Sequence, residues 1–168
     1  AAVCEWKVNE PDAWDPQPAL AVRAVARAEA DRFEAAAAAV WDTAAARGPH
    51  ALIMTGATGT TLASGLSAED VNGTYDCVPA ERMPGGAPVY KRRGKVRGKQ
   101  LWLFLAPCNS RWYVHDTEAK NARRAAGRAR TAAAVAPGTL PHEAPAGGWQ
   151  VAVGANMWDP QHAVAVRG

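Results

Sequence analysis

A short segment occurs twice in the chain, once toward each end. Residues Trp14–Arg23 agree with Trp158–Arg167 at eight of ten positions, and both begin with the tetrapeptide WDPQ. Each copy follows another tryptophan, in Trp6-Lys7-Val8 and in Trp149-Gln150-Val151, at a spacing of eight residues in the first copy and nine in the second. Agreement over this length indicates a duplicated structural unit rather than chance.

The position of the two copies predicts how the chain is organised. We interpret the pattern WxV…WDPQxAxAVR as the end of one repeat. Residues 1–17 are then the C-terminal strands of a preceding repeat, residues 18–50 an alanine-rich linker helix, and residues 51–168 a β module. In the alternative, both copies are strands of one domain. A catalytic site does not need two copies of an apolar strand, so in either case the shared tryptophans are expected to be structural anchors. These are Trp6, Trp14, Trp149 and Trp158.

Alanine-rich sequence follows the first copy. Between Pro18 and Arg47, apolar residues recur every three or four positions, and the charged residues lie mostly off that stripe. This period is typical of an amphipathic helix, and Gly48-Pro49 ends it. The pattern predicts a helix over about residues 18–47 that links the two repeats.

Short β-type segments separated by turn residues make up most of the remainder. They are Leu52–Thr55, a strand entered through the Asn72-Gly73 turn, Pro88–Lys91, Gln100–Leu105, Arg111–His115 and the strands of the last repeat copy. Residues 79–88 are expected to form a loop. The pattern of residues 117–136, which Gly127 interrupts, does not predict a long helix. The predicted fold class is mainly β with one long helix: a small antiparallel β-sandwich or partly open barrel preceded by the alanine-rich α-helix.

Taken in order, several motifs of the β module resemble a known family. They are Met54–Ala57, Val71–Tyr75, Pro88–Lys91, Leu101–Leu103, Arg111–Val114, Leu140-Pro141, Gly148–Val151 and Trp158–Gln161. This ordered set, over about residues 52–166, resembles the uncharacterised VNGTY-type β-rich repeat module of microalgal and other protist multidomain proteins. The arginine of that family's GRPVY motif is absent, because Ala87 stands in its place. The resemblance implies a fold and a modular organisation, and it brings no catalytic residue.

A dinucleotide-binding loop is the most specific alternative in the sequence. The segment Leu52–Gly59 reads as a strand followed by TGATG, as in the phosphate-binding turn of a Rossmann fold. However, position 62, where the third glycine should fall, is Leu62, and Val71–Tyr75 offers no acidic strand end about 20 residues on. We therefore expect no cofactor.

Patterns for catalysis or metal binding are weak. Ser64, Ser67 and Ser110 lack a GxSxG setting, and the four histidines lack metal-ligand spacing. His115 and Asp116 are residue types that form a base and its orienting carboxylate, but they are more simply a strand-end histidine beside a turn aspartate. The sequence predicts no catalytic residue and no metal ligand.

Six cations lie within nine residues between two predicted strands. They are Lys91, Arg92, Arg93, Lys95, Arg97 and Lys99, here called the basic hairpin. Such a density suits contact with an acidic partner or phosphates, and it also discourages edge pairing. Because the net charge is only +3, we favour protein contact or solubility over nucleic acid. An anionic lipid headgroup or a polysaccharide stays open as an alternative.

The sequence leaves the compartment unknown. It has no run of about 18 apolar residues and no recognisable signal peptide, and it is compatible with a soluble, organellar or membrane-peripheral protein. The three cysteines lack zinc spacing, and pairing of Cys77 with Cys108 is left open. The sequon Asn72-Gly73-Thr74 is weak evidence for secretion, because the same residues form a turn without a sugar.

Together these features predict a non-catalytic structural or interaction module of a tandem-repeat or multi-subunit assembly that contacts protein partners. The basic hairpin and the exposed helix face are the expected contact surfaces. Two alternatives stay open. One is a carbohydrate or other small-ligand module that uses at least two exposed tryptophans. The other is an accessory or linker subunit of a large, membrane-peripheral complex.

Overall fold

The computed structural model describes residues 7–10, 13–16, 23–59, 67–145, 147–154 and 157–168. The chain forms two compact units, Ala1–Arg32 and Phe33–Gly168.

The first unit contains a β-hairpin. Strand β1 (Lys7–Glu10) pairs antiparallel with β2 (Ala13–Pro16), and the two form a separate two-stranded sheet. The hairpin covers part of the first repeat copy. Trp6 and residues 17–22 lie outside the described residues, so the structure does not report on the first anchor tryptophan or on the end of this copy.

Helix α1 (Arg27–Arg47) begins later than the predicted residue 18. Residues 23–26 are not helical, and residues 18–22 lie outside the described part of the chain. The helix buries only residues of its second half, Trp41 and Ala44. Packing, more than intrinsic propensity, stabilises most helices in proteins, so the alanine-rich segment before Arg27 is not held in the helix by burial. The helix ends at Arg47, as Gly48-Pro49 predicted.

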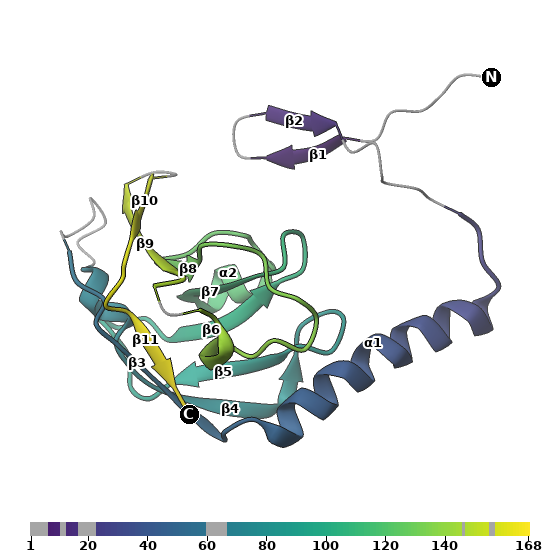
Figure 1. The fold of residues 1–168 in the computed structure, drawn as a ribbon, viewed down its shortest axis with the longest axis horizontal. Coiled ribbons are helices and arrows are strands. Elements are labelled where there is room, and N and C mark those ends of the chain that lie inside the picture. Colours follow the sequence, from purple (N-terminus) through teal and green to yellow (C-terminus); the bar gives the residue numbers. More distant parts are fainter. Residues whose placement is uncertain (1–6, 11–12, 17–22, 60–66, 146, 155–156) are drawn as a thin grey trace. The chain divides into compact units, whose positions relative to one another are not determined.

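The second unit is dominated by one antiparallel sheet of nine strands, in the order β10-β9-β8-β7-β6-β5-β4-β3-β11. The strands are β3 (Ala51–Thr55), β4 (Gly73–Arg82), β5 (Pro88–Arg92), β6 (Leu101–Ala106), β7 (Arg111–Asp116), β8 (Ala129–Thr131), β9 (Trp149–Gly154), β10 (Met157–Pro160) and β11 (Ala165–Arg167). The sheet curls into a half-barrel (Figure 1). The predicted fold class, mainly β with one long helix and a partly open barrel, is therefore confirmed.

The core is densest around the central strand β6, where all six residues are buried. The fully buried Trp112 of β7 packs edge to face with Trp41 of α1 and with Tyr90 of β5, at ring-centroid distances of 6.1 and 6.2 Å. Trp102 of β6 is buried next to the short helix α2 (Thr117–Asn121). Its indole Nε1 donates to Thr117 Oγ1 of this helix at 2.9 Å. Aromatic side chains of this size supply much of the apolar area that holds a small sheet together.

Two local expectations about strands were wrong. Residues 79–82 were expected to be loop, yet β4 continues to Arg82. The ladder between β4 and β5 shifts register between Cys77 and Arg82, and this irregular stretch accommodates Pro79, which has no N–H to donate. Strand β8 was not predicted, because its three residues are too few and too polar to show a period. Its place is decided by pairing with β7 on one side and β9 on the other.

Candidate functional site

The basic hairpin closes on a tight turn between β5 and β6. Val96 and Lys99 exchange two backbone hydrogen bonds of 2.9 Å each. The two residues between them, Arg97 and Gly98, have φ angles of 49° and 78°. Positive φ at both central residues matches the twist of antiparallel strands, so the turn itself has ordinary hairpin geometry.

Most of the predicted contact cations are engaged within the molecule. Arg92 donates from Nε and Nη2 to the carbonyl oxygen of Asn72, at 3.1 and 2.8 Å. Arg93 makes a bidentate contact with Asp76, and this pairing lowers the pKa of the Asp76 carboxyl. These two arginines join β5 to the start of β4.

The tip of the basic hairpin is joined to two further carboxylates. Arg97 lies 3.5 Å from Asp70 of the 3₁₀ helix Ala68–Val71, and Lys99 lies 3.6 Å from Asp116. Lys91 lies 5.4 Å from the centre of the Trp102 ring. Lys91 and Lys95 have no carboxylate partner among the described residues, and these two are the cations that a partner would meet uncompensated.

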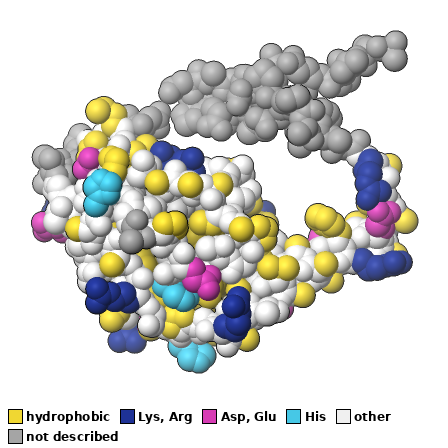
Figure 2. Space-filling view, in the orientation of Figure 1, with side chains coloured by type: hydrophobic (Ala, Val, Ile, Leu, Met, Phe, Trp, Pro, Cys, Tyr) yellow, Lys and Arg dark blue, Asp and Glu magenta, His cyan; other side chains and the backbone are white. Residues whose placement is uncertain are grey.

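The surface agrees with this pairing. On the face shown in Figure 2, Lys and Arg side chains are dispersed among acidic, neutral and apolar ones, and those drawn there form no continuous basic patch. Phosphate-binding surfaces concentrate cations along a stripe or groove.

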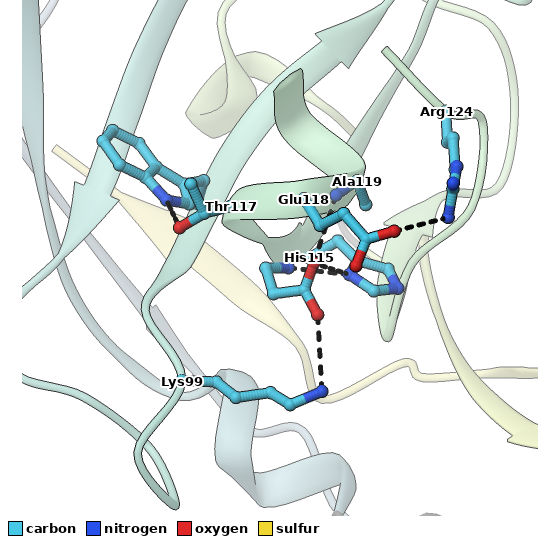
Figure 3. Close-up of polar contacts among 8 residues, drawn as sticks. Lys99, His115, Thr117, Glu118, Ala119 and Arg124 are labelled. Atoms are coloured by element: carbon cyan, nitrogen blue, oxygen red, sulfur yellow. Dashed lines mark hydrogen bonds and ion pairs between the residues drawn. The ribbon is translucent and has the colours of Figure 1, made fainter. Parts of the chain in front are cut away.

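His115 and Asp116 lie at the end of β7, where Figure 3 shows their contacts. Asp116 is the N-cap of α2: its Oδ1 accepts a hydrogen bond from the N–H of Ala119 at 3.1 Å. His115 Nδ1 accepts the backbone N–H of Asp116 at 2.7 Å. The same nitrogen lies 3.1 Å from Asp116 Oδ1, so the backbone and the side chain of Asp116 both contact this edge of the imidazole.

The contact between His115 and Asp116 can be compared with that of a catalytic pair. In a catalytic histidine–aspartate pair, Nδ1–H donates to the carboxylate and the other nitrogen acts as the base. Here Asp116 contacts Nδ1 through both its Oδ1 and its backbone N–H, and the same carboxylate caps α2 by accepting from Ala119. Burial lowers the pKa of His115, and this effect outweighs the opposing influence of Asp116. Burial raises the pKa of Asp116, but the Ala119 N–H, His115 and Lys99 more than offset it, so the net pKa is lowered. The pair serves to begin α2.

A buried arginine lies near the same end of the sheet. Arg128 is 5% exposed, and its Nη1 has no hydrogen-bond partner among the described residues. Burial lowers the pKa of the guanidinium, although Asp116 and Asp70 act in the opposite direction. A buried cation with an unsatisfied donor costs stability. Sequence reasoning missed Arg128, because its burial depends on strand β8, which the sequence did not reveal.

The glycine-rich loop after β3 is occupied by the protein itself. The N–H of Ala57 donates to Asn72 Oδ1 at 3.0 Å, and the N–H of Thr58 donates to Gln161 Oε1 at 3.1 Å. A phosphate-binding turn needs such N–H groups free and a parallel sheet behind it, whereas β3 pairs antiparallel with β4. The Asn72 side-chain nitrogen in turn donates to the Ala57 carbonyl at 2.9 Å, so the amide of the sequon is engaged in the fold.

The tryptophans are mostly internal. Trp41, Trp102, Trp112 and Trp149 are at most 6% exposed, and Trp158 is half-buried. The Trp158 ring lies 6.2 Å from the ring of Tyr113 and 4.0 Å from the guanidinium carbon of Arg130. The predicted anchor Trp14 belongs to β2, and its side chain is outside what the structure describes. A carbohydrate platform needs at least two exposed tryptophans, and those with described side chains do not form one.

The described residues offer neither a membrane-spanning helix nor a cluster of metal ligands. Within the described ranges, no helix is long and apolar enough to cross a membrane. Among the same residues, no three His, Cys, Asp or Glu side chains are grouped to hold a metal ion. Cys77, half-buried in β4, and the exposed Cys108 are both free thiols.

No known protein family, curated protein sequence or solved structure matches the chain.

Proposed function

We propose that the chain is a non-catalytic structural module of a tandem-repeat or multi-subunit assembly and that it contacts protein partners. The observation that carries the proposal is the use of the WDPQ segment. In the second copy Gln161 is buried and hydrogen-bonds within the fold, and the half-buried Trp158 packs against Tyr113. A segment duplicated for this purpose supports an architectural role.

The WDPQ segment works as a clasp. Gln161, 7% exposed, accepts from the N–H of Thr58, while its Nε2 donates to Asp159 Oδ2 at 2.7 Å. Its backbone N–H donates to the carbonyl of Trp149 at 2.9 Å. The clasp therefore joins the end of β10 to β9 and to the loop that follows β3. These bonds satisfy the side-chain amide of Gln161, which would be costly to bury without partners.

The polar groups elsewhere support the same role. His115 and Asp116 begin a helix, Arg92 and Arg93 hold β5 to β4, and the glycine-rich loop receives side chains of its own chain. In each case these contacts are with other residues of the same chain. The partner-facing groups are Lys91 and Lys95, which have the least internal compensation.

Lysine-directed cross-linking with mass spectrometry in native extract tests the proposal. We expect Lys91 and Lys95 to form cross-links to other polypeptides. Lys120 is the matched control, because it is 9% exposed, contacts Glu81 and lies over the Trp102 ring, and it should react poorly. Cross-links from Lys91 and Lys95 confined to their own chain would contradict a role in contacting partners.

A further inference from the structure

We propose that residues 6–23 are a closing segment for a second sheet of the same kind. They would bind it as Trp149–Arg167 binds the sheet of its own module. This inference rests on the proposed structural role and names the partner: another module of this architecture, contacted through strand addition.

The backbones of the two copies agree in register. The first hairpin pairs Lys7 with Pro16, Val8 with Asp15 and Asn9 with Trp14. The second pairs Gln150 with Pro160, Val151 with Asp159 and Ala152 with Trp158. These are the same sequence positions in both copies. The extra residue of the second copy coincides with a register shift between Met157 and Trp158, because a β-bulge absorbs one residue without changing the pairing beyond it.

The residues shared by the copies are those that attach the second copy to its sheet. Trp149 and Val151 are 2% and 0% exposed and belong to the core. Trp158 lies against Arg130 of β8, and Gln161 reaches the loop after β3. The first copy has the same residue types at the matching positions, namely Trp6, Val8, Trp14 and Gln17. A free-standing hairpin would not need a buried-type tryptophan, valine and glutamine at these places.

Within the described residues, the first hairpin has no strand in the place that β8 takes beside β9. Strand β9 pairs with β10 on one side and with β8 on the other, through Gln150 and Arg130 among others. Within the described residues β1 pairs with β2 alone. An isolated two-stranded hairpin is marginally stable in water, and the unpaired edge of β1 offers the donors and acceptors that strand addition uses.

The recipient is a second sheet, because the β8 edge of the chain's own module is already filled. Strand β9 occupies that edge over three residue pairs, from Ala129 to Thr131. A matching recipient presents a β8-type edge, a pocket for Trp6 and Val8, and a glycine-rich loop whose N–H groups receive Gln17. Such a sheet is a module of this type whose own closing segment is absent or displaced.

A graft within the full chain tests the match. Residues 149–167 are replaced by residues 6–23, and the thermal unfolding of the graft is followed by circular dichroism. We expect one cooperative transition, lowered by less than about 10 °C, a shift of a few kcal/mol or less for a domain of this size. The matched control is the same graft with its Val8 and Gln17 positions changed to Ala, which should lose the transition. A graft that melts no better than this control overturns the proposal.

A mixing experiment tests binding between chains. In the acceptor, Trp149→Ala and Val151→Ala loosen β9 from β8, and the donor is the unchanged full chain. We expect a mixed complex by size exclusion with light scattering, and restored protection of β8 amides if the acceptor alone is partly unfolded. A donor carrying Trp6→Ala and Val8→Ala should give neither. Equal results with both donors overturn the proposal, whereas the lysine cross-links described above would still report on other protein contacts.

Discussion

The side-chain oxygen of Gln161 accepts a hydrogen bond from the backbone N–H of Thr58 at 3.1 Å, across 103 positions of sequence. Asp159 orients the amide by accepting from its nitrogen at 2.7 Å. The bond links the repeated segment to the loop that otherwise looks like a phosphate-binding turn. This contact gives the glutamine of WDPQ a structural role, and it engages the Thr58 N–H of that loop within the chain.

Replacing Gln161 with Ala should destabilise the β module. The change removes the hydrogen bonds to the Thr58 N–H and the Asp159 carboxylate, and because both residues are exposed, the loss is about 0.5–1.5 kcal/mol for each bond. Urea denaturation followed by tryptophan fluorescence measures the loss. Gln17→Ala, at the matching position of the first copy, is the control and should leave the unfolding of the β module unchanged. Equal losses in the two variants would contradict the assignment of the clasp to Gln161.

Gly56→Ala should be among the most damaging substitutions in the chain. Gly56 has φ of 80°, and an added Cβ would lie 2.0 Å from the carbonyl oxygen of Ala163. Gly94→Ala is a matched control, because its φ is 70° and an added Cβ meets nothing within 4 Å.

Both glycine variants carry the strain of a left-handed backbone, about 1–2 kcal/mol. Only Gly56→Ala also separates β11 from the loop after β3. Thermal unfolding should therefore show a much larger decrease for Gly56→Ala than for Gly94→Ala. Similar decreases would mean that the close approach of Ala163 is relieved at little cost.

His115 should make the fold less stable in mild acid. Its pKa is lowered in the fold, mainly by burial, so the unfolded chain binds more protons as the pH falls below the ordinary histidine pKa of about 6.5. Stability then decreases with falling pH until the lowered folded pKa is passed.

His115→Asn keeps an acceptor for the Asp116 N–H but does not titrate. Its unfolding temperature should fall less than that of the unchanged chain between pH 7.5 and pH 5.5. Identical pH profiles would show that His115 is not held neutral. The lowered pKa of Asp116 acts at more acid pH, because its stabilisation is complete above the unfolded pKa and is lost only as the folded carboxyl is protonated.

Arg128→Met should preserve or raise stability. The guanidinium is buried, burial lowers its pKa, and its Nη1 lacks a partner among the described residues. An apolar side chain of similar length removes that cost, and apolar replacement of whole buried ion pairs is often neutral or stabilising by about 1–4 kcal/mol. Chemical denaturation at neutral pH measures the change. A loss above about 2 kcal/mol would show that Asp70 and Asp116 depend on this cation.

Much of the sheet was predictable from local sequence. Strands β5, β6 and β7 fall where alternation and turn residues placed them, and the half-barrel agrees with the predicted fold class. Local pattern is informative there because a hairpin brings neighbouring segments together and its turn sets the register. The helix end at Arg47 is similarly local, since Gly48-Pro49 follows it.

The candidate site was predictable only as a set of residues. The sequence contains six cations between two strands, but their carboxylate partners Asp70, Asp76 and Asp116 come from other strands and a 3₁₀ helix. The charge of the basic hairpin is thereby largely compensated. Which cations remain available to a partner depends on these non-local pairs. The density of cations in the sequence therefore overestimated the number of uncompensated positive charges on the surface.

The sequence by itself determined the repeated segment, the positions of several strands and the class of the fold, because these follow from local pattern and from comparison of the chain with itself. Only the tertiary structure decided the place of β8, the burial of Arg128 and the attachment of Gln161 to Thr58. Each of these depends on groups that are distant in sequence and become neighbours only when the sheet has curled.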